Sequence, residues 1–340
     1  MANGSYYAEK EYMEVSAIVV SYNSQDRVER SVGALQESLG HLDHEILVVD
    51  NASSDRTVEL AGKLLPGDCV IVNRQNLGFG QGVNRGLRAA RGRYSLIMND
   101  DVVLEPGSID RLLGALRADA GIAVAGPLMV DAHGQQTHSA RLWYPGWEEE
   151  WVRLTDIVLR RQRKAAYPGS CQEGLVEVKW LVAACMLGRT DVLRAIGGFN
   201  PAFFMYGEDI DFGRRLRALG YVSVTIPGAR AVHEGGASTS TVWSDEDRML
   251  RRARSRDTYY RMWVRRPSRM LLNLRRTLGF RNQPLRLRYF LPRVIYDGPS
   301  LRKLRFPDPI KPDLRVSEVQ EGTLDESSPS STDGGEPRNP

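Results

Sequence analysis

Two neighbouring carboxylates follow an apolar run in the first third of the chain, where they could bind a metal ion. The segment is Asn99-Asp100-Asp101. Mg²⁺ and Mn²⁺ are typically held by one or two carboxylates together with the phosphates of a substrate. The same residues could instead form a turn whose aspartates cap the next helix. The pattern alone leaves both interpretations open.

A second acidic cluster could move a proton. Glu208, Asp209 and Asp211 lie just before or inside the start of a helical pattern. Carboxylates in one site raise one another's pKa, so that one of them could act as a general base. The structural alternative is stabilisation of the helix dipole, with Asp211 and Arg215 paired at i, i+4. This alternative could account for Asp211 completely.

Three further segments could bind a ligand. Asp50-Asn51 follows another apolar run, where a carboxylate can accept hydrogen bonds from a base or ribose or form an Asx-turn. The run from Asn76 to Asn84 contains three glycines before a helical pattern, which would permit close backbone approach and place a helix N-terminus near an anion. It matches neither the P-loop nor the dinucleotide fingerprint. His233, before a glycine pair, could be structural or a ligand.

An alternation of apolar runs with helical patterns must position these residues. We expect strands at 15–20, 45–49, 69–72, 94–98, 122–125, 180–187 and 222–226, and helices at 28–39, 83–90, 109–116 and 209–219, with one after Ser53 or Ser54. Such an alternation predicts βαβ units and a parallel sheet. Ligands of open α/β sheets bind beyond the carboxyl ends of the strands. The polar segments Ser21-Tyr22-Asn23, Asp50-Asn51 and Asn99-Asp100-Asp101 should therefore converge on one edge.

Composition excludes several classes of protein. The chain has 340 residues, a formal net charge of +4 and three cysteines, which excludes a disulfide-built secreted scaffold and offers no zinc-binding spacing. Neither a secretory signal nor an apolar run long enough to span a membrane is visible. These features predict a reduced, cytoplasmic protein.

The positive charge is concentrated in one segment. Residues 245–306 contain a large excess of arginine, whereas residues 1–244 and 307–340 are both net acidic. Arginines interleaved with aromatic and apolar residues are typical of an interfacial helix at an anionic membrane. Packing against the core and binding of nucleic acid are the alternatives, and we favour the membrane over packing and both over nucleic acid. Residues 307–340 lack periodicity and predict a disordered acidic tail.

The order of the motifs resembles glycosyltransferase family 2, and within it the bacterial rhamnosyltransferase branch. The resemblance covers residues 14–240 and rests on six segments: 19–24, 48–55, 76–84, 98–101, 197–209 and 227–233. It implies a GT-A fold, an inverting mechanism, a nucleotide-sugar donor and a divalent metal, Mg²⁺ or Mn²⁺. Two positions depart from the family pattern: Asn99 replaces a frequent Asp, and Ala183-Ala184 stand where a Gly often precedes a small pair.

The resemblance also implies roles for individual residues. The nucleotide pocket would contain Ser21, Tyr22 and Asn23, with Asp50 and Asn51 at the base edge. The wall under the nucleotide and donor sugar would contain Asn76, Gly78, Phe79 and Asn84. Asp101 would bind the metal, with Asn99 and Asp100 beside it and His233 reaching the metal or the diphosphate. Asp209 would be the catalytic base and Glu208 its supporting neighbour.

We therefore predict an α/β protein with a GT-A fold, a Rossmann-like and mostly parallel sheet flanked by helices, and a C-terminal basic helical extension. The predicted divisions are an N-terminal extension at 1–13, a catalytic domain at 14–244, the extension at 245–306 and the tail at 307–340. The predicted reaction moves a sugar, L-rhamnose from dTDP-L-rhamnose, onto a hydroxyl of a glycan, lipid-linked or small glycoside acceptor, with possible peripheral contact at the inner face of the membrane. Two alternatives are another UDP- or dTDP-sugar, and a non-catalytic scaffold that binds membrane or nucleic acid.

Overall fold

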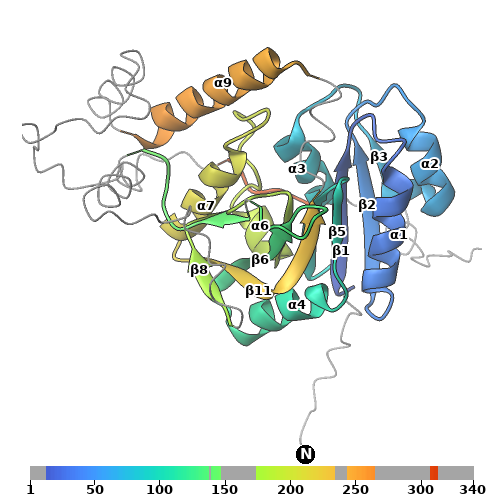
Figure 1. The fold of residues 1–340 in the computed structure, drawn as a ribbon, viewed down its shortest axis with the longest axis horizontal. Helices are drawn as coiled ribbons and strands as arrows, with labels where there is room; N and C mark the ends of the chain where they lie inside the picture. Colours follow the sequence, from blue (N-terminus) through green and yellow to red (C-terminus); the bar gives the residue numbers. More distant parts are fainter. Residues whose placement is uncertain (1–12, 138, 147–173, 234–242, 265–306, 313–340) are drawn as a thin grey trace, which may run out of the picture.

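A curled sheet of nine strands forms the centre of the molecule, with helices on both sides (Figure 1). The computed structural model describes residues 13–137, 139–146, 174–233, 243–264 and 307–312. The strand order is β3-β2-β1-β4-β10-β6-β11-β5, and β8 pairs with β11. The strands of this sheet are β1 Val15–Ser21, β2 His44–Asp50, β3 Val70–Val72, β4 Tyr94–Asn99, β5 Val102–Leu104, β6 Ile122–Val130, β8 Val176–Val178, β10 Cys185–Arg189 and β11 Val222–His233. A small second sheet pairs β7 Ala140–Arg141 with β9 Trp180–Leu181.

Amphipathic helices cover the sheet. They are α1 Val28–Leu39, α2 Thr57–Leu64, α3 Phe79–Ala89, α4 Ser108–Ala118, α6 Thr190–Ala195, α7 Glu208–Ala218 and α9 Asp245–Trp263, with a 3₁₀ turn at Gly67–Cys69. The apolar positions that predicted α1 are all buried: Val28, Val32, Leu35 and Leu39. The helical spacing of these apolar residues therefore predicted the buried face of α1 correctly, because that face packs on the sheet.

The first half of the sheet is parallel, as predicted. β1 pairs in parallel with both β2 and β4, and β2 pairs in parallel with β3. In this register Ser21 lies opposite Asp50, and Val20 lies opposite Asn99. The polar residues that end these strands consequently meet at one edge, which confirms the expected convergence.

The second half of the sheet is mixed, with β6 and β11 still parallel to each other. β10 runs antiparallel to both β4 and β6. The predicted strand 180–187 is interrupted between β9 and β10. β11 does not stop at Pro227 but continues to His233 through an irregularity between Ile226 and Arg230. Such a bulge accommodates a proline, which has no N–H to donate to a neighbouring strand.

Two of the three glycines of the run, Gly80 and Gly82, lie inside α3, and Gly78 directly precedes it. This helix begins at Phe79, several residues earlier than predicted. A Cβ on Gly86 would lie 2.3 Å from the Ile18 side chain, and one on Gly82 would lie 2.8 Å from Val20. The glycines therefore allow α3 to pack closely on β1. The predicted helix after Ser53 or Ser54 is α2, but neither serine is its N-cap, because α2 begins at Thr57 and Arg56 precedes it.

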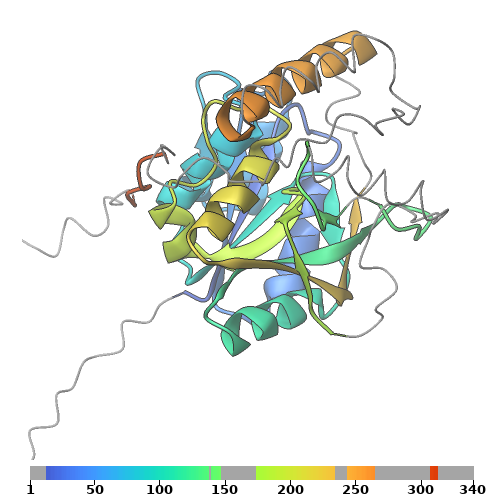
Figure 2. The same ribbon diagram turned by 90° about the vertical axis from the view of Figure 1, so that its left-hand side faces the viewer.

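The first part of the basic extension packs on the core. Figure 2 shows the C-terminal end of α9 next to α7, where Tyr259, Tyr260 and Trp263 form a buried aromatic cluster with Phe203. Packing, the less favoured alternative, is thus what the described residues 243–264 do. The rest of the extension, 265–306, lies outside the described residues.

The beginning of the predicted tail is also packed. Ile310 is 8% exposed within the main hydrophobic core, and its N–H donates a 2.8 Å hydrogen bond to the Arg194 carbonyl. The prediction of disorder was therefore wrong for residues 307–312, because a single apolar side chain in a polar segment gives no periodic signal. No helix in the described ranges is long and apolar enough to cross a membrane.

Candidate functional site

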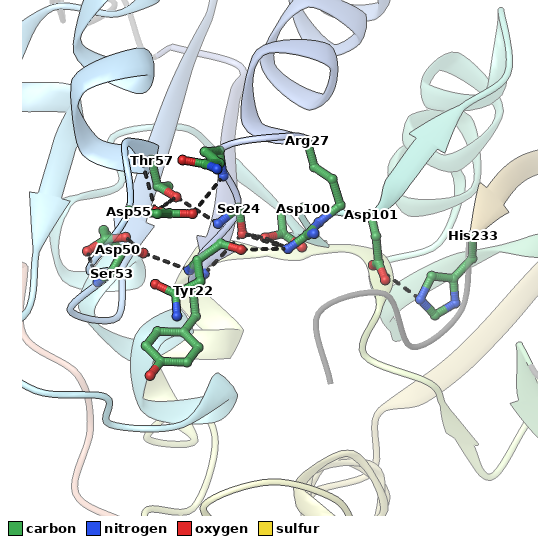
Figure 3. Close-up of polar contacts among 12 residues, drawn as sticks. Tyr22, Ser24, Arg27, Asp50, Ser53, Asp55, Thr57, Asp100, Asp101 and His233 are labelled. Atoms are coloured by element: carbon green, nitrogen blue, oxygen red, sulfur yellow. Dashed lines mark hydrogen bonds and ion pairs between the residues drawn. The ribbon is translucent and has the colours of Figure 1, made fainter. Parts of the chain in front are cut away.

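Two strand-end loops are tied together at the edge of the sheet (Figure 3). The buried carboxylate of Asp50 accepts hydrogen bonds from the Ser53 N–H, at 2.9 Å, and from the Ser53 hydroxyl. Asn23 has a left-handed backbone, with φ 48°; its N–H donates to the Ser53 hydroxyl at 2.8 Å and its side-chain oxygen accepts from the Ser54 N–H at 2.9 Å. Asp50 thus stabilises the turn after β2, although its partner is three residues on and not two residues on as in the Asx-turn that the sequence offered as an alternative. That turn fixes Asn23 at the edge where a nucleotide was expected.

Asn51 and Gly78 join this edge to the start of α3. The Asn51 amide donates to the Gly78 carbonyl at 3.2 Å and accepts from the Asn73 amide at 2.9 Å. Asn76 accepts a 2.9 Å hydrogen bond from the Gly78 N–H. A Cβ on Gly78, whose φ is +82°, would lie 2.0 Å from the Phe204 carbonyl oxygen. The close approach that requires this glycine is therefore made by a protein loop.

Asn84, inside α3, binds the beginning of the loop that includes Phe199 and Phe204. Its amide donates to the Phe199 carbonyl at 2.7 Å and accepts from the Phe199 N–H at 2.8 Å. The Phe79 ring, also predicted in the donor wall, meets the Phe199 ring edge to face, with centroids 6.0 Å apart. In the structure, both hydrogen-bonding ends of the Asn84 amide position the loop.

Asp100 and Asp101 have different surroundings although they are adjacent. Asp100 accepts a hydrogen bond from the Ser24 hydroxyl, and the Arg27 guanidinium lies 3.5 Å from its carboxylate (Figure 3). Arg27 also donates to the Ser24 hydroxyl, at 3.1 Å, and to the Asn23 carbonyl, at 3.2 Å. The charge of buried Asp100 is thus compensated within the protein. Ser24 and Arg27 were missed by the sequence analysis, because their contact with Asp100 spans more than 70 residues.

Asp101 faces His233 instead. The Nε2 atom of His233 lies 3.3 Å from Oδ1 of Asp101 (Figure 3). β5 brings them together, because Val102 pairs with His233. Oδ1 of Asp101 is buried and has no hydrogen-bond partner among the described residues. A buried carboxylate oxygen without a donor, facing an imidazole nitrogen, fits a shared cation.

The protein alone does not complete such a cation site within the described residues. No group of three or more His, Cys, Asp and Glu side chains is arranged there to hold a metal. Asp101 and His233 could therefore supply two ligands. Mg²⁺ and Mn²⁺ commonly take the rest from substrate phosphates and water.

Glu208 and Asp209 begin α7, directly after the loop that packs on Gly78. Glu208 is 7% exposed, and its Oε2 atom has no partner among the described residues. Burial, with the nearby charge of Asp209, raises the pKa of Glu208 to about 8. Burial raises the pKa of Asp209 to about 6, opposed by backbone N–H groups that include Ile210 at 2.8 Å. An Asp with this pKa is ionised at neutral pH and still basic enough to accept a proton.

Models of two related families match the chain. The glycosyl transferase family 2 model matches residues 16–174, and the glycosyl transferase family group 2 model matches residues 96–297. The chain belongs to glycosyltransferase family 2. It is 30% identical over 242 residues to an N-acetylglucosaminyl-diphospho-decaprenol L-rhamnosyltransferase of Mycobacterium tuberculosis, covering 65% of this chain and 76% of that protein. This family 2 enzyme thus lies in the rhamnosyltransferase-like branch, as the sequence predicted.

Other similarities are shorter or more distant. The glycosyltransferase is 30% identical over 147 residues to succinoglycan biosynthesis protein ExoO of Rhizobium meliloti, which covers 43% of this chain and 40% of that protein. Among solved structures, TarS of S. aureus in complex with UDP-GlcNAc superposes with a TM-score of 0.47 and 17% identity, covering 68% of this chain and 62% of that one. The GT-A class expected from the resemblance agrees with the α/β architecture described above.

Asp211, the third acid of the glycosyltransferase's cluster, is a structural residue. Its carboxylate pairs with Arg215 at 2.8 Å and accepts a 2.8 Å hydrogen bond from the Trp263 indole. Arg215 in turn donates to the carbonyls of Ile196, at 2.7 Å, and Gly198, at 2.6 Å. The structural alternative for Asp211 is therefore confirmed, and only Glu208 and Asp209 remain available for chemistry.

Proposed function

We propose that this family 2 glycosyltransferase transfers L-rhamnose from dTDP-L-rhamnose to a hydroxyl of a lipid-linked glycan, inverting the anomeric centre. The donor and acceptor classes are taken from the mycobacterial relative, whose name specifies a rhamnosyl group and a diphospho-decaprenol-linked acceptor. The reaction type is supported chiefly by one combination of residues. Asp101 and His233 lie 3.3 Å apart, as two ligands of a cation could, and Asp209 has a pKa raised to about 6, as a general base could. Transfer of another sugar from a UDP or dTDP donor is the alternative within the same reaction class.

The leaving group would be bound at the edge formed by the ends of β1, β2 and β4. Tyr22, Asn23 and Asp50 would contact the nucleotide, and the hydroxyl of Ser21, which is buried and unpartnered among the described residues, is available beside them. Asp101 and His233 would hold Mg²⁺ or Mn²⁺, which supplies charge neutralisation of the diphosphate when bound. Asn99 and Asp100 would fix the turn that presents Asp101.

Asp209 would act as the base. Its carboxylate accepts the proton of the acceptor hydroxyl while that oxygen forms a bond to the anomeric carbon. The bond from this carbon to the diphosphate breaks, and its electron pair leaves with the diphosphate. A single displacement inverts the anomeric centre, so no protein nucleophile is required.

Glu208 would remain protonated during this step. With a pKa of about 8, its carboxyl group is mainly neutral at pH 7. A neutral carboxyl can donate a hydrogen bond, whereas a second ionised group would repel the charge of Asp209. Glu208 would thus support the base without competing for the proton.

Contact with the inner face of a membrane is part of the proposal for α9. Met249 is 66% exposed and Leu250 is 50% exposed, and several exposed arginines share the helix. Apolar side chains among arginines favour the surface of an anionic bilayer. Nucleic acid is not proposed as a partner.

A donor screen tests the function. The full chain is incubated with Mg²⁺ or Mn²⁺, a lipid-diphosphate-linked N-acetylglucosamine and each of several UDP- and dTDP-sugars, and the released nucleoside diphosphate is measured. We expect release that depends on acceptor and is highest with dTDP-L-rhamnose, and loss of transfer with retained nucleotide binding in Asp209→Asn. Acceptor-dependent release with another donor would select the alternative sugar. Transfer that survives in Asp209→Asn would remove Asp209 as the base.

A further inference from the structure

Two arginines of α9 lie on aromatic rings next to the segment that carries the proposed base. The guanidinium of Arg251 lies 4.1 Å from the Trp243 ring centroid and 4.9 Å from that of Phe204. The guanidinium of Arg252 lies 4.9 Å from the Tyr206 ring centroid. Cation–π contacts of this kind hold the planar group by its faces. The N–H groups at its edge then remain available for an anion.

These two guanidiniums have no carboxylate partner in the part of the chain that the structure describes. Other arginines of α9 do: Arg248 pairs with Asp245, and Arg261 pairs with Asp257. Neither Arg251 nor Arg252 forms an ion pair or a hydrogen bond among the described residues. Two adjacent cations without counter-charges, fixed by rings, form a preorganised position for a dianionic group.

The position of this arginine pair relates it to the acceptor. Tyr206 precedes Asp209 by three residues, so their Cα atoms are at most about 11 Å apart. The Ser255 hydroxyl donates to the Met205 carbonyl at 2.6 Å, which fixes α9 against the same segment. The two cations therefore lie on the segment 204–206, which leads directly into α7 and the proposed base.

We propose that Arg251 and Arg252 bind the phosphate groups of a lipid-diphosphate-linked acceptor. This inference rests on the proposed function, because it assumes that the acceptor is lipid-linked. Arginine forks recognise phosphate oxygens through paired, charge-assisted hydrogen bonds. Met249 and Leu250 directly precede the two arginines and are exposed, so they offer apolar surface for the first part of the lipid chain. The same phosphate chemistry could come from bilayer headgroups, and the experiment separates the two sources.

The first measurement is direct binding. The full chain, with its donor site saturated by dTDP and Mg²⁺, is titrated with farnesyl diphosphate and, separately, with farnesol. We expect wild type to prefer farnesyl diphosphate, and the double variant Arg251→Gln/Arg252→Gln to bind it at least about tenfold more weakly. Arg254→Gln is the matched control, since Arg254 is exposed on the same helix and has no ring contact among the described residues. Unchanged affinity in the double variant would overturn the proposal.

The second measurement separates the phosphate sources and a merely structural role. Transfer is assayed with a diphosphate-linked acceptor and with a neutral alkyl glycoside of the same sugar. We expect KM to rise only for the diphosphate-linked acceptor, while kcat for the neutral glycoside stays at the wild-type value. Equal losses with both acceptors would assign the arginines to packing of α9. Loss of flotation with phosphatidylglycerol vesicles, with farnesyl diphosphate binding intact, would assign them to bilayer headgroups and overturn the acceptor role.

The two hypotheses fail in distinguishable ways. If wild type releases no nucleoside diphosphate with any donor, the proposed function fails. If wild type transfers sugar and the arginine variants do so equally well with the diphosphate-linked acceptor, only the acceptor-phosphate site fails.

Discussion

The indole N–H of Trp263 donates a 2.8 Å hydrogen bond to the carboxylate of Asp211, joining α9 to α7 across 52 residues of sequence. Asp211 lies two residues after Asp209. The same carboxylate pairs with buried Arg215 on its other side. The helix that presents the proposed base is thus held by a residue of the basic extension.

Replacing Trp263 by Phe should test this connection. The variant keeps an aromatic ring but loses a hydrogen bond to a buried charge, so we expect a loss of about 1.5–3 kcal/mol in the free energy of unfolding. We also expect a lower kcat with little change in the KM for the donor, because the base helix is displaced and the nucleotide edge is not. Denaturant unfolding and steady-state kinetics measure both effects. Trp180→Phe is the matched control, since among the described residues its indole donates only to a neutral carbonyl, that of Trp143, at 3.2 Å. An equally large kcat loss there would contradict the connection.

The pH dependence of the reaction should report on Asp209. Its carboxylate must be ionised to accept a proton, so kcat/KM should fall as the pH is lowered through about 6. An acid limb near pH 4, the ordinary range of an aspartate, would contradict the raised pKa.

Glu208→Gln should retain activity at pH 7, because Glu208 is mainly protonated there. Its pKa is raised in the folded state, so between the unfolded value near 4.5 and about 8 the native protein binds more protons than the unfolded chain. Wild-type stability should therefore fall as pH rises through this window, and the uncharged Gln variant should lose less. At pH 8 we expect the variant to be the more stable protein, by on the order of 1 kcal/mol. A parallel pH dependence of unfolding in both proteins would be the contrary result.

Removal of either side chain of the Asp101–His233 pair should weaken cation binding. Asp101→Asn and His233→Asn should each reduce Mn²⁺ affinity in the presence of dTDP, measured by calorimetry, and lower turnover by about 100-fold or more. EDTA should suppress wild-type activity. His41→Asn is the control, because that histidine pairs with Asp110 on the surface. Full turnover in EDTA would exclude the proposed metal role.

Arg27 and Asp100 should behave as a coupled pair. Arg27→Met removes the cation that lies 3.5 Å from a buried carboxylate and should cost about 3–5 kcal/mol of stability. Asp100→Asn keeps a partner for the Ser24 hydroxyl and should cost less. The double variant should recover part of the Arg27→Met loss, giving a coupling free energy of about 0.5–3 kcal/mol in a double-mutant cycle. Strict additivity would mean that the 3.5 Å contact carries no net interaction.

Local pattern determined much of this enzyme from the sequence. The parallel half of the sheet, the buried face of α1 and the convergence of Asp50 and Asn99 on one edge were all predictable, because strand–helix alternation fixes which ends of parallel strands meet. The order of short motifs identified the family. The Asp211–Arg215 pair was also predictable, since i, i+4 spacing places two side chains on one helix face.

Only the tertiary structure decided which polar residues remain free for chemistry. Asp100 and Asp101 are neighbours in sequence, but Arg27 compensates the first and His233 faces the second. Long-range packing also decided that the glycine run serves close contact within the protein, that α9 docks on α7 and that Ile310 returns to the core. Such contacts depend on distances between residues far apart in the chain, and composition and periodicity contain no information about those distances.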